Sequence, residues 1–120
     1  MIPGLSEARR DLAAALEYPP LDGVDAVYEQ ESNREASGPC YLTVALEAVR
    51  PTEIVLAVRV YSQMVDGVGD ATDTLEAALE GADDRLLALG LGPSDWQVGL
   101  DAEISCMVAR CFVNQPRTSF

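Results

Sequence analysis

The chain has 120 residues and a net charge of −12, which comes from 20 acidic residues against eight basic ones, all of them arginine. This length fits a single domain spanning residues 1–120, and a hydrophobic content of 48% is sufficient for a sizeable core. The acidity argues against attraction to a nucleic-acid backbone, and the absence of histidine removes the usual activator of a serine or cysteine nucleophile.

The first predicted element is an amphipathic helix from Ser6 to Glu17, within the N-terminal segment 1–20. Ser6 can cap its N-terminus, and the two prolines that follow the helix terminate it. The apolar residues of one side recur at helical spacing: Leu5, Ala8, Leu12, Ala15 and Leu16. After this helix, residues 24–29 are predicted to form a small strand, and residues 30–39 a polar loop.

Two strands joined by a tight turn are predicted in the second half of the strand-bearing segment 24–61. If residues 50–52 close a hairpin, residues whose numbers add up to 102 lie opposite one another. One face then consists of aliphatic pairs: Ala48 with Ile54, Leu46 with Leu56, Val44 with Val58, and Leu42 with Val60. The other face is mixed: Glu47 with Val55, Ala45 with Ala57, Thr43 with Arg59, and Tyr41 with Tyr61. We interpret the mixed face as partly covered by another subunit, with an ordinary solvated sheet face as the alternative.

A long amphipathic helix is predicted for the segment 70–90. Asp70 can cap it, and Gly90 provides its C-terminal stop. Its apolar stripe steps by four and three residues: Leu75, Leu79, Ala82, Leu86 and Leu89. Gly81 costs the helix about 1 kcal/mol, whereas the burial of the leucines returns about 2 kcal/mol each, so the stripe is expected to pack on the aliphatic face of the hairpin. A coiled coil is the alternative, but the stripe is short for one.

The segment 95–113 is rich in strand-forming residues. Every even-numbered residue from 96 to 112 is apolar except Arg110. One straight strand of this length would span nearly 60 Å, whereas a domain of this size is only about 35 Å across. We therefore expect a break near residues 101–103 or a kink at Gly99, unless the strand leaves the body of the protein to complete a neighbour's sheet.

Together these elements predict an α+β fold. It consists of a mainly antiparallel sheet with two helices packed on one face, in the order helix, small strand, hairpin, helix and strands. The tail, residues 114–120, is polar apart from its terminal phenylalanine, and we expect it either to fray or to act as a docking arm.

The chain offers little for catalysis or for binding a cofactor or a metal ion. An odd count of three cysteines, Cys40, Cys106 and Cys111, with no signal-peptide pattern, indicates a reducing, cytoplasmic setting. On one strand, Cys106 and Cys111 would lie about 16 Å apart, too far for a disulfide. With no histidine and no Cys-x-x-Cys pair, a zinc site is not expected. We therefore predict a protein that is not an enzyme and has no catalytic residue, cofactor or metal site.

The order of the elements resembles the small tail terminator (tail completion) proteins of long-tailed, siphovirus-type bacteriophages, and more loosely the neighbouring head-to-tail connector proteins. The resemblance covers the first helix, the hairpin, the long helix and the strand-rich end through Val113. The family is recognised by architecture and size, so no functional residue is carried over from it. The composition, rich in alanine, glycine, aspartate and arginine without lysine, also looks like that of a phage of G+C-rich actinobacteria.

The resemblance implies a structural role. Subunits would close into a ring, commonly a hexamer, that caps the tail tube protein and joins it to a head-to-tail connector or stopper protein. The ring would form in the host cytoplasm and end in the tail-neck region of the virion. Genome DNA would pass through its lumen without specific binding, which an acidic wall favours. No membrane partner is expected, since no apolar run is long enough to cross a bilayer.

In such a ring, one side of each subunit must fit a different side of the next. We predict that the mixed face of the hairpin, the loops 30–39 and 63–69, and the tail supply these sides. The residues proposed for the subunit interface are Tyr41, Thr43, Arg59, Tyr61, Arg34, Met64, Val65, Arg117 and Phe120. Replacing Arg59 and Tyr61 by alanine is expected to weaken ring assembly and to leave the fold intact.

Two other functions stay open. Another head-to-tail connector or tail tube subunit of the same particle would share these features, although a tube subunit polymerises into filaments whereas a terminator ring stops at a closed count. An acidic DNA-mimic inhibitor would instead display carboxylates as a regular stripe at phosphate-like spacing. DNA would then compete with the protein for its partner.

Overall fold

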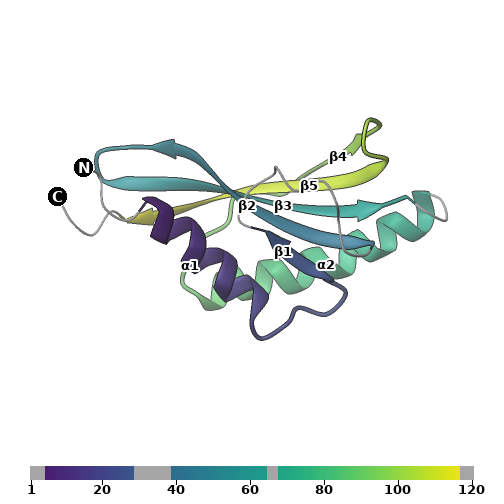
Figure 1. Ribbon diagram of the computed structural model, residues 1–120, viewed down its shortest axis with the longest axis horizontal. Coiled ribbons are helices and arrows are strands. Elements are labelled where there is room, and N and C mark those ends of the chain that lie inside the picture. Colours follow the sequence, from purple (N-terminus) through teal and green to yellow (C-terminus); the bar gives the residue numbers. More distant parts are fainter. Residues whose placement is uncertain (1–4, 29–38, 65–67, 117–120) are drawn as a thin grey trace.

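The computed structural model describes residues 5–28, 39–64 and 68–116. The elements in this part of the chain are α1 (Leu5–Glu17), β1 (Ala26–Tyr28), β2 (Cys40–Val49), β3 (Glu53–Gln63), α2 (Val68–Ala88), β4 (Gln97–Asp101) and β5 (Cys106–Pro116). The strands form one sheet in the order β1-β2-β3-β5-β4, in which β1 is parallel to β2 and all other neighbours are antiparallel. Both helices lie on the same side of the sheet (Figure 1), so the predicted α+β fold is confirmed.

The hairpin of β2 and β3 has the predicted register over most of its length. Residues whose numbers add up to 102 are opposite one another from Cys40 and Ser62 to Leu46 and Leu56. A β-bulge then places Ala48 opposite Val55, so the predicted pairs of Ala48 with Ile54 and Glu47 with Val55 were wrong. The bulge leaves one extra residue on β2, because the hairpin closes where the backbone nitrogen of Arg50 donates to the carbonyl oxygen of Glu53 at 2.8 Å.

The aliphatic face of the hairpin lies under the helices, as predicted. The buried side chains of this face share one core with residues of β5 and of both helices. The largest fully buried aliphatic side chains of the whole core are Leu12, Leu16, Leu42, Leu56, Leu86, Val44, Val58, Val60 and Val113. Full burial of each such side chain is worth about 1.5–3 kcal/mol relative to exposure. This core is therefore the main source of stability, and it fixes the sheet as a support for whatever lies on its other face.

Helix α2 packs on the sheet through a stripe that differs slightly from the predicted one. The buried residues of α2 are Ala71, Leu75, Ala78, Ala82 and Leu86, whereas Leu79 is half-buried. Leu89 is exposed, so its prediction as a core residue was wrong. The helix has already ended there: Gly90 adopts a φ of 79°, its nitrogen bonds to the carbonyl oxygen of Leu87, and the nitrogen of Leu91 bonds to that of Leu86. This Schellman motif confirms Gly90 as the C-terminal stop.

Helix α1 is held against α2 by an arginine as well as by apolar contacts. Its Leu12, Ala13 and Leu16 are buried in the common core. The guanidinium of Arg85, on α2, donates to the carbonyl oxygen of Ala15 at 2.7 Å and to that of Pro19 at 2.9 Å. These carbonyls lie at and just beyond the C-terminal end of α1, where a positive charge is favoured. The short strand β1 follows, within the predicted range 24–29.

The strand-rich end is a hairpin of β4 and β5. A turn at residues 102–105 joins them, so the expected break near residues 101–103 is confirmed. β5 pairs with β3 along its whole length and ends with Pro116 opposite Glu53. The prediction that the strands stop at residue 113 was therefore wrong, because this pairing holds the first residues of the predicted tail in the sheet.

The apolar even-numbered residues of this hairpin do not share one face. In β4, Val98 and Leu100 lie opposite Ala109 and Met107, on the side of the helices. In β5 it is the odd-numbered residues that pack in the helix-side core, namely Met107, Ala109, Cys111 and Val113. The even-numbered residues of β5 face the other way. The β4–β5 turn therefore changes which residues face the helices, from the even-numbered ones in β4 to the odd-numbered ones in β5.

Candidate functional site

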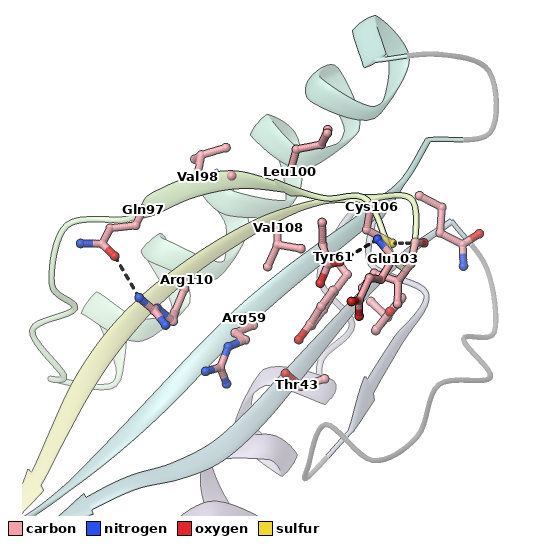
Figure 2. Close-up of a pocket in the computed structure, with 15 residues that line it drawn as sticks. Thr43, Arg59, Tyr61, Gln97, Val98, Leu100, Glu103, Cys106, Val108 and Arg110 are labelled. Carbon is pink, nitrogen blue, oxygen red and sulfur yellow. Dashed lines mark hydrogen bonds between the residues drawn. The ribbon is translucent and has the colours of Figure 1, made fainter.

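On the face of the sheet away from the helices, side chains form rows across the strands, because opposite residues in neighbouring strands point to the same side. One polar row crosses all five strands: Tyr28, Thr43, Arg59, Arg110 and Gln97. The adjacent row consists of Ala26, Tyr41, Tyr61, Val108 and Gly99. The members of both rows on β2 to β5, with the β4–β5 turn, line a cleft of about 490 Å³ (Figure 2), which we call the open-face cleft.

Three tyrosines form an aromatic cluster beside this cleft. The rings of Tyr41 and Tyr61 stack with centroids 4.7 Å apart and an interplanar angle of 6°, and Tyr28 meets Tyr41 edge-on at 5.9 Å. Tyr41 and Tyr61 are only 6% and 8% exposed, and they pack with Cys106 in a second, smaller core. Burial raises the pKa of Tyr41 to about 12. An alanine at Tyr61 would leave a cavity, so this replacement is expected to lower the stability of the subunit as well.

Two arginines lie on this face of the sheet, next to the row of tyrosines. Arg59 on β3 is directly opposite Arg110 on β5. One terminal nitrogen of Arg110 donates to Oε1 of Gln97 at 3.1 Å (Figure 2), and its guanidinium carbon lies 5.2 Å from the ring centroid of Phe112. These contacts fix the direction of Arg110.

Two buried polar atoms of the same row have no hydrogen-bond partner within the described part of the chain. They are the Oγ1 of Thr43 and the Nε of Arg110. Thr43 is 1% exposed, so its hydroxyl has lost the water that would otherwise bond to it. Each unsatisfied buried group of this kind costs about 1–3 kcal/mol. The polar row therefore carries unused bonding capacity at Thr43 and Arg110.

The opposite end of the open-face cleft is acidic. Asp101, at the end of β4, and Glu103, in the turn, both line it. The backbone nitrogen of Glu103 donates to Oδ1 of Asp101 at 3.1 Å, which holds the turn. The cleft is thus bipolar, with arginines towards Gln97 and carboxylates towards the β4–β5 turn.

The cysteines give the protein no nucleophile at neutral pH. All three are free and buried. Burial raises the pKa of Cys40 and of Cys111 to about 12, and it also raises that of Cys106. A thiol with a raised pKa stays protonated and unreactive. Among the residues that the structure describes, no three Cys, Asp or Glu side chains are grouped so as to hold a metal ion.

The structure brings together four of the residues proposed from the sequence. Tyr41, Thr43, Arg59 and Tyr61 all line the open-face cleft. Met64, just after β3, is half-buried and lies outside the lining; its backbone nitrogen donates to the carbonyl oxygen of Ser105 at 2.9 Å. The remaining proposed residues, Arg34, Val65, Arg117 and Phe120, lie outside the described residues, as do the loop 30–38 and residues 65–67.

Sequence reasoning missed Arg110 and Gln97. Arg110 carried a signal, since it is the one residue that interrupts the apolar even-numbered positions from 96 to 112. Its place opposite Arg59 depends on the register of β5 against β3, which no local pattern specifies. No pattern in the sequence distinguishes Gln97 from the residues around it.

The sheet ends in an edge that no strand covers within the described residues. β4 pairs with β5 on one side only, and four of its five residues are exposed. Val98 and Leu100 are 56% and 57% exposed. Edge strands usually carry charges or prolines that prevent pairing with other chains. The middle of β4 carries neither, so it is open to a partner.

The outward side of α2 is acidic with one exposed leucine. Asp73, Glu80 and Asp84 lie opposite the buried stripe of this helix and are exposed, and Leu87 follows on the same side with 56% exposure. No ion pair of Glu80 or Asp84 is present among the described residues. These side chains therefore form a second charged surface, on the other side of the molecule from the open-face cleft.

Neither described helix is both long and apolar enough to span a membrane. No protein-family model matches this chain, and no curated protein matches it.

Proposed function

We propose that this protein is a structural subunit that assembles with copies of itself into a closed ring, and that the ring is the tail terminator of a long-tailed bacteriophage. The order of elements supports the proposal, because helix, hairpin, helix and strands were the basis of the resemblance. The ring caps the tail tube and joins it to the connector or stopper protein of the neck. Genome DNA passes through it, and the net charge of −12 favours passage without binding.

The observation that carries self-assembly is the uncovered edge strand β4. In the part of the chain that the structure describes, no strand pairs with the outer side of its backbone, and Val98 and Leu100 expose apolar surface. Adding a strand from another chain to such an edge is a recurring mode of association. A contact between this edge and a different surface of the next copy is heterologous, and heterologous contacts generate rings when the rotation closes.

Light scattering and negative-stain electron microscopy of the purified protein test this proposal. We expect a closed assembly with a fixed number of copies that caps preformed tail tubes. Replacing Val98 and Leu100 by aspartate should abolish it, because a charge on each would be desolvated in the contact. The matched control is Asp95→Ser, which changes an exposed charge just before β4 and outside the open-face cleft. A protein that stays monomeric at all concentrations contradicts the proposal.

A tube or connector subunit of the same particle gives a different result. A tube subunit grows into filaments of unlimited length when purified, because its heterologous contact does not close. A connector ring closes but binds the portal side of the neck and leaves free tail tubes uncapped. Filaments or uncapped tubes would therefore replace the terminator assignment by one of these.

The acidic outer side of α2 favours one further candidate, a DNA-mimic inhibitor. Asp73, Glu80 and Asp84 recur along the helix on its outward side, and Glu76 lies close to them. Carboxylates four residues apart on a helix are separated by about 6 Å along its axis, so they form a regular acidic stripe of the kind that a DNA mimic would display. The solvated face of an ordinary amphipathic helix has the same pattern. A DNA-processing enzyme that binds the protein and releases it when duplex DNA is added would support the mimic.

A further inference from the structure

We propose that the open-face cleft binds an extended segment of a different protein, in which an acidic and a basic residue are four positions apart with an apolar residue midway between them. The acidic side chain contacts Arg110, and the basic one contacts Asp101 and Glu103. This binding site goes beyond the self-assembly proposed above and does not depend on it.

Arg110 is the charge that the acidic residue of the segment meets. Its contacts are with two uncharged side chains, Gln97 and Phe112. It forms no ion pair within the described part of the chain, and its Nε is buried there without a hydrogen-bond partner. The two contacts hold the guanidinium in one direction, which lowers the entropy lost on binding. A carboxylate is the group that a guanidinium binds most strongly, through charge-assisted hydrogen bonds.

A second unsatisfied group belongs to the same polar row. Thr43 is 1% exposed and lines the cleft, and its Oγ1 has no hydrogen-bond partner among the residues that the structure describes. Buried polar groups without a partner are few in native proteins. Two of them in one row of a cleft therefore indicate a surface that a molecule from outside completes.

The other end of the cleft offers two carboxylates to a basic side chain. Neither Asp101 nor Glu103 forms an ion pair within the described residues. Glu103 is exposed, and the bond that holds the turn uses its backbone nitrogen and not its carboxylate. A lysine or arginine of the segment is attracted to this end for the same reason that its acidic residue is repelled from it.

The separation of the two ends sets the spacing of the charges in the segment. Figure 2 shows Arg110 and Gln97 at one end of the cleft and Glu103 at the other. Along β4, Gln97 and Asp101 are four residues apart, which corresponds to about 13 Å in a strand. An extended segment rises equally per residue, and its alternate side chains point to the same side. Its first, third and fifth residues therefore reach Arg110, the middle of the cleft and the acidic turn.

Gly99 leaves room for the third residue in the middle of the cleft. It lies opposite Val108, and a Cβ at Gly99 would have no other atom within 4 Å. A glycine inside a strand often marks a place where a ligand or another backbone approaches closely. Val108 and Tyr61 line the cleft beside this space, so an apolar side chain finds apolar surface there.

A second copy of this chain does not supply the segment. The sequence contains no lysine, and none of its eight arginines has an aspartate or glutamate four residues before or after it. The partner is therefore a different protein. The cleft volume of about 490 Å³ is within the range of about 300–1,000 Å³ that is typical of ligand sites, so a short segment is sufficient to occupy it.

Saturation-transfer difference NMR with synthetic peptides tests this site, because the method detects weak binding to a monomer and to a large assembly alike. The probe is an N-acetylated, C-amidated heptapeptide of serines with glutamate at the second position, valine at the fourth and lysine at the sixth. The control peptide has the same composition with glutamate and lysine adjacent. The probe should bind about 10-fold more tightly than the control, because only the probe reaches both ends of the cleft.

Arg110→Glu should change which peptide binds. The variant is acidic at both ends of the cleft, so it should bind the probe about 10-fold more weakly and prefer a peptide with lysine at both charged positions. Arg50→Glu is the matched control, because it makes the same change of charge at an exposed arginine outside the cleft. This control should bind the probe like the unmodified protein.

Gly99→Val tests the space in the middle of the cleft without changing a charge. The valine fills the position of the third residue, so the variant should bind the probe about 10-fold more weakly. Gly92→Ala, outside the cleft, should have no effect. Circular dichroism and thermal unfolding establish that the variants fold. If Arg110→Glu does not fold, Arg110→Gln takes its place and should weaken binding of the probe by about 10-fold.

The results separate this site from the proposed function. If the unmodified protein binds neither peptide, or binds both equally, the site is wrong. Unchanged binding of the probe by the Arg110 variant also overturns it, as does an equal loss in Arg50→Glu. These results leave the ring proposal untouched, because light scattering measures assembly separately. Tighter binding of the probe that is lost on substitution of Arg110 and Gly99 supports the site.

Discussion

The two faces of the sheet differ in what covers them. On the helix side, leucine, valine and alanine of the strands meet α1 and α2 in one continuous core. On the open side, three tyrosines form a small cluster and a polar row with two arginines runs beside it. The covered face needs nothing beyond the chain itself. The open face leaves a buried hydroxyl and a guanidinium nitrogen without partners in the described residues, which is the condition of a surface that is completed by another molecule.

The largest expected effect is a difference in unfolding free energy between substitutions on the two faces of the sheet. Leu56, fully buried on the helix side, should lose about 2–5 kcal/mol of unfolding free energy when replaced by alanine, because the substitution leaves a cavity. Arg59→Gln, at a half-buried position on the open side of the same strand, should cost the unassembled subunit less, about 0.5–1.5 kcal/mol, which is the usual net contribution of one hydrogen bond. Urea unfolding measures both values. A loss of equal size at the two positions would contradict the assignment of the main core to the helix side.

The second prediction concerns pH and the thiols of the covered face. The pKa of Cys111 rises from 9.0 to about 12 on folding, because burial disfavours the thiolate. Below pH 9 the Cys111 thiol is protonated in both the folded and the unfolded chain, so its contribution to the unfolding free energy is fully present. Between pH 9 and 12 the unfolded chain releases a proton that the folded chain keeps, so the thiol lowers the unfolding free energy by about 1.4 kcal/mol for each pH unit.

Cys111→Ala provides the comparison for this pH dependence. The variant should lose stability less steeply than the unmodified protein when urea midpoints are measured from pH 8 to 10.5. Parallel curves for the two proteins would mean that this thiol titrates alike in the folded and unfolded states, and would argue against its burial in the core.

A third prediction sharpens the contrast from the open side. Thr43→Val removes the unsatisfied hydroxyl and keeps the branched shape, so the unassembled subunit should gain about 1 kcal/mol of unfolding free energy. Thermal unfolding at concentrations below assembly measures the change. A loss of stability would indicate that the hydroxyl has a hydrogen-bond partner within the subunit.

The smallest effect is expected within the helix layer. A Cβ at Gly81 would meet only the Cδ2 of Leu21, at 3.9 Å, so there is space for a methyl group. Gly81→Ala should therefore raise the unfolding free energy by about 0.5–1 kcal/mol through helix propensity. Differential scanning calorimetry measures it. A decrease would show that α2 packs more closely on Leu21, in the segment between α1 and β1, than this distance indicates.

The covered face could be predicted from the sequence because its signals are local. Alternation across a short turn gave the register of β2 and β3 as far as Leu46 and Leu56, and helical spacing placed α2 on the aliphatic face. The bulge near Ala48 was missed because a single extra residue leaves the alternating pattern almost unchanged. Leu89 was assigned to the core because the spacing continues past the residue at which the helix ends.

The candidate site was predicted only in the part that one hairpin supplies. Tyr41, Thr43, Arg59 and Tyr61 belong to β2 and β3, whose pairing the sequence indicates. Arg110 and Gln97 join them through the pairings of β5 with β3 and of β4 with β5. These pairings depend on the β4–β5 turn, which changes the side of the sheet that even-numbered residues face. They also depend on a contact between segments far apart in the chain. No local periodicity contains that information.

The most direct test of the account is the molar mass of the purified protein by size-exclusion chromatography with light scattering. The account predicts a discrete assembly whose mass is a fixed multiple of the 12.8 kDa subunit and does not grow with concentration. A single species of 12.8 kDa at every concentration would contradict the claim that the β4 edge is completed by further copies of the chain.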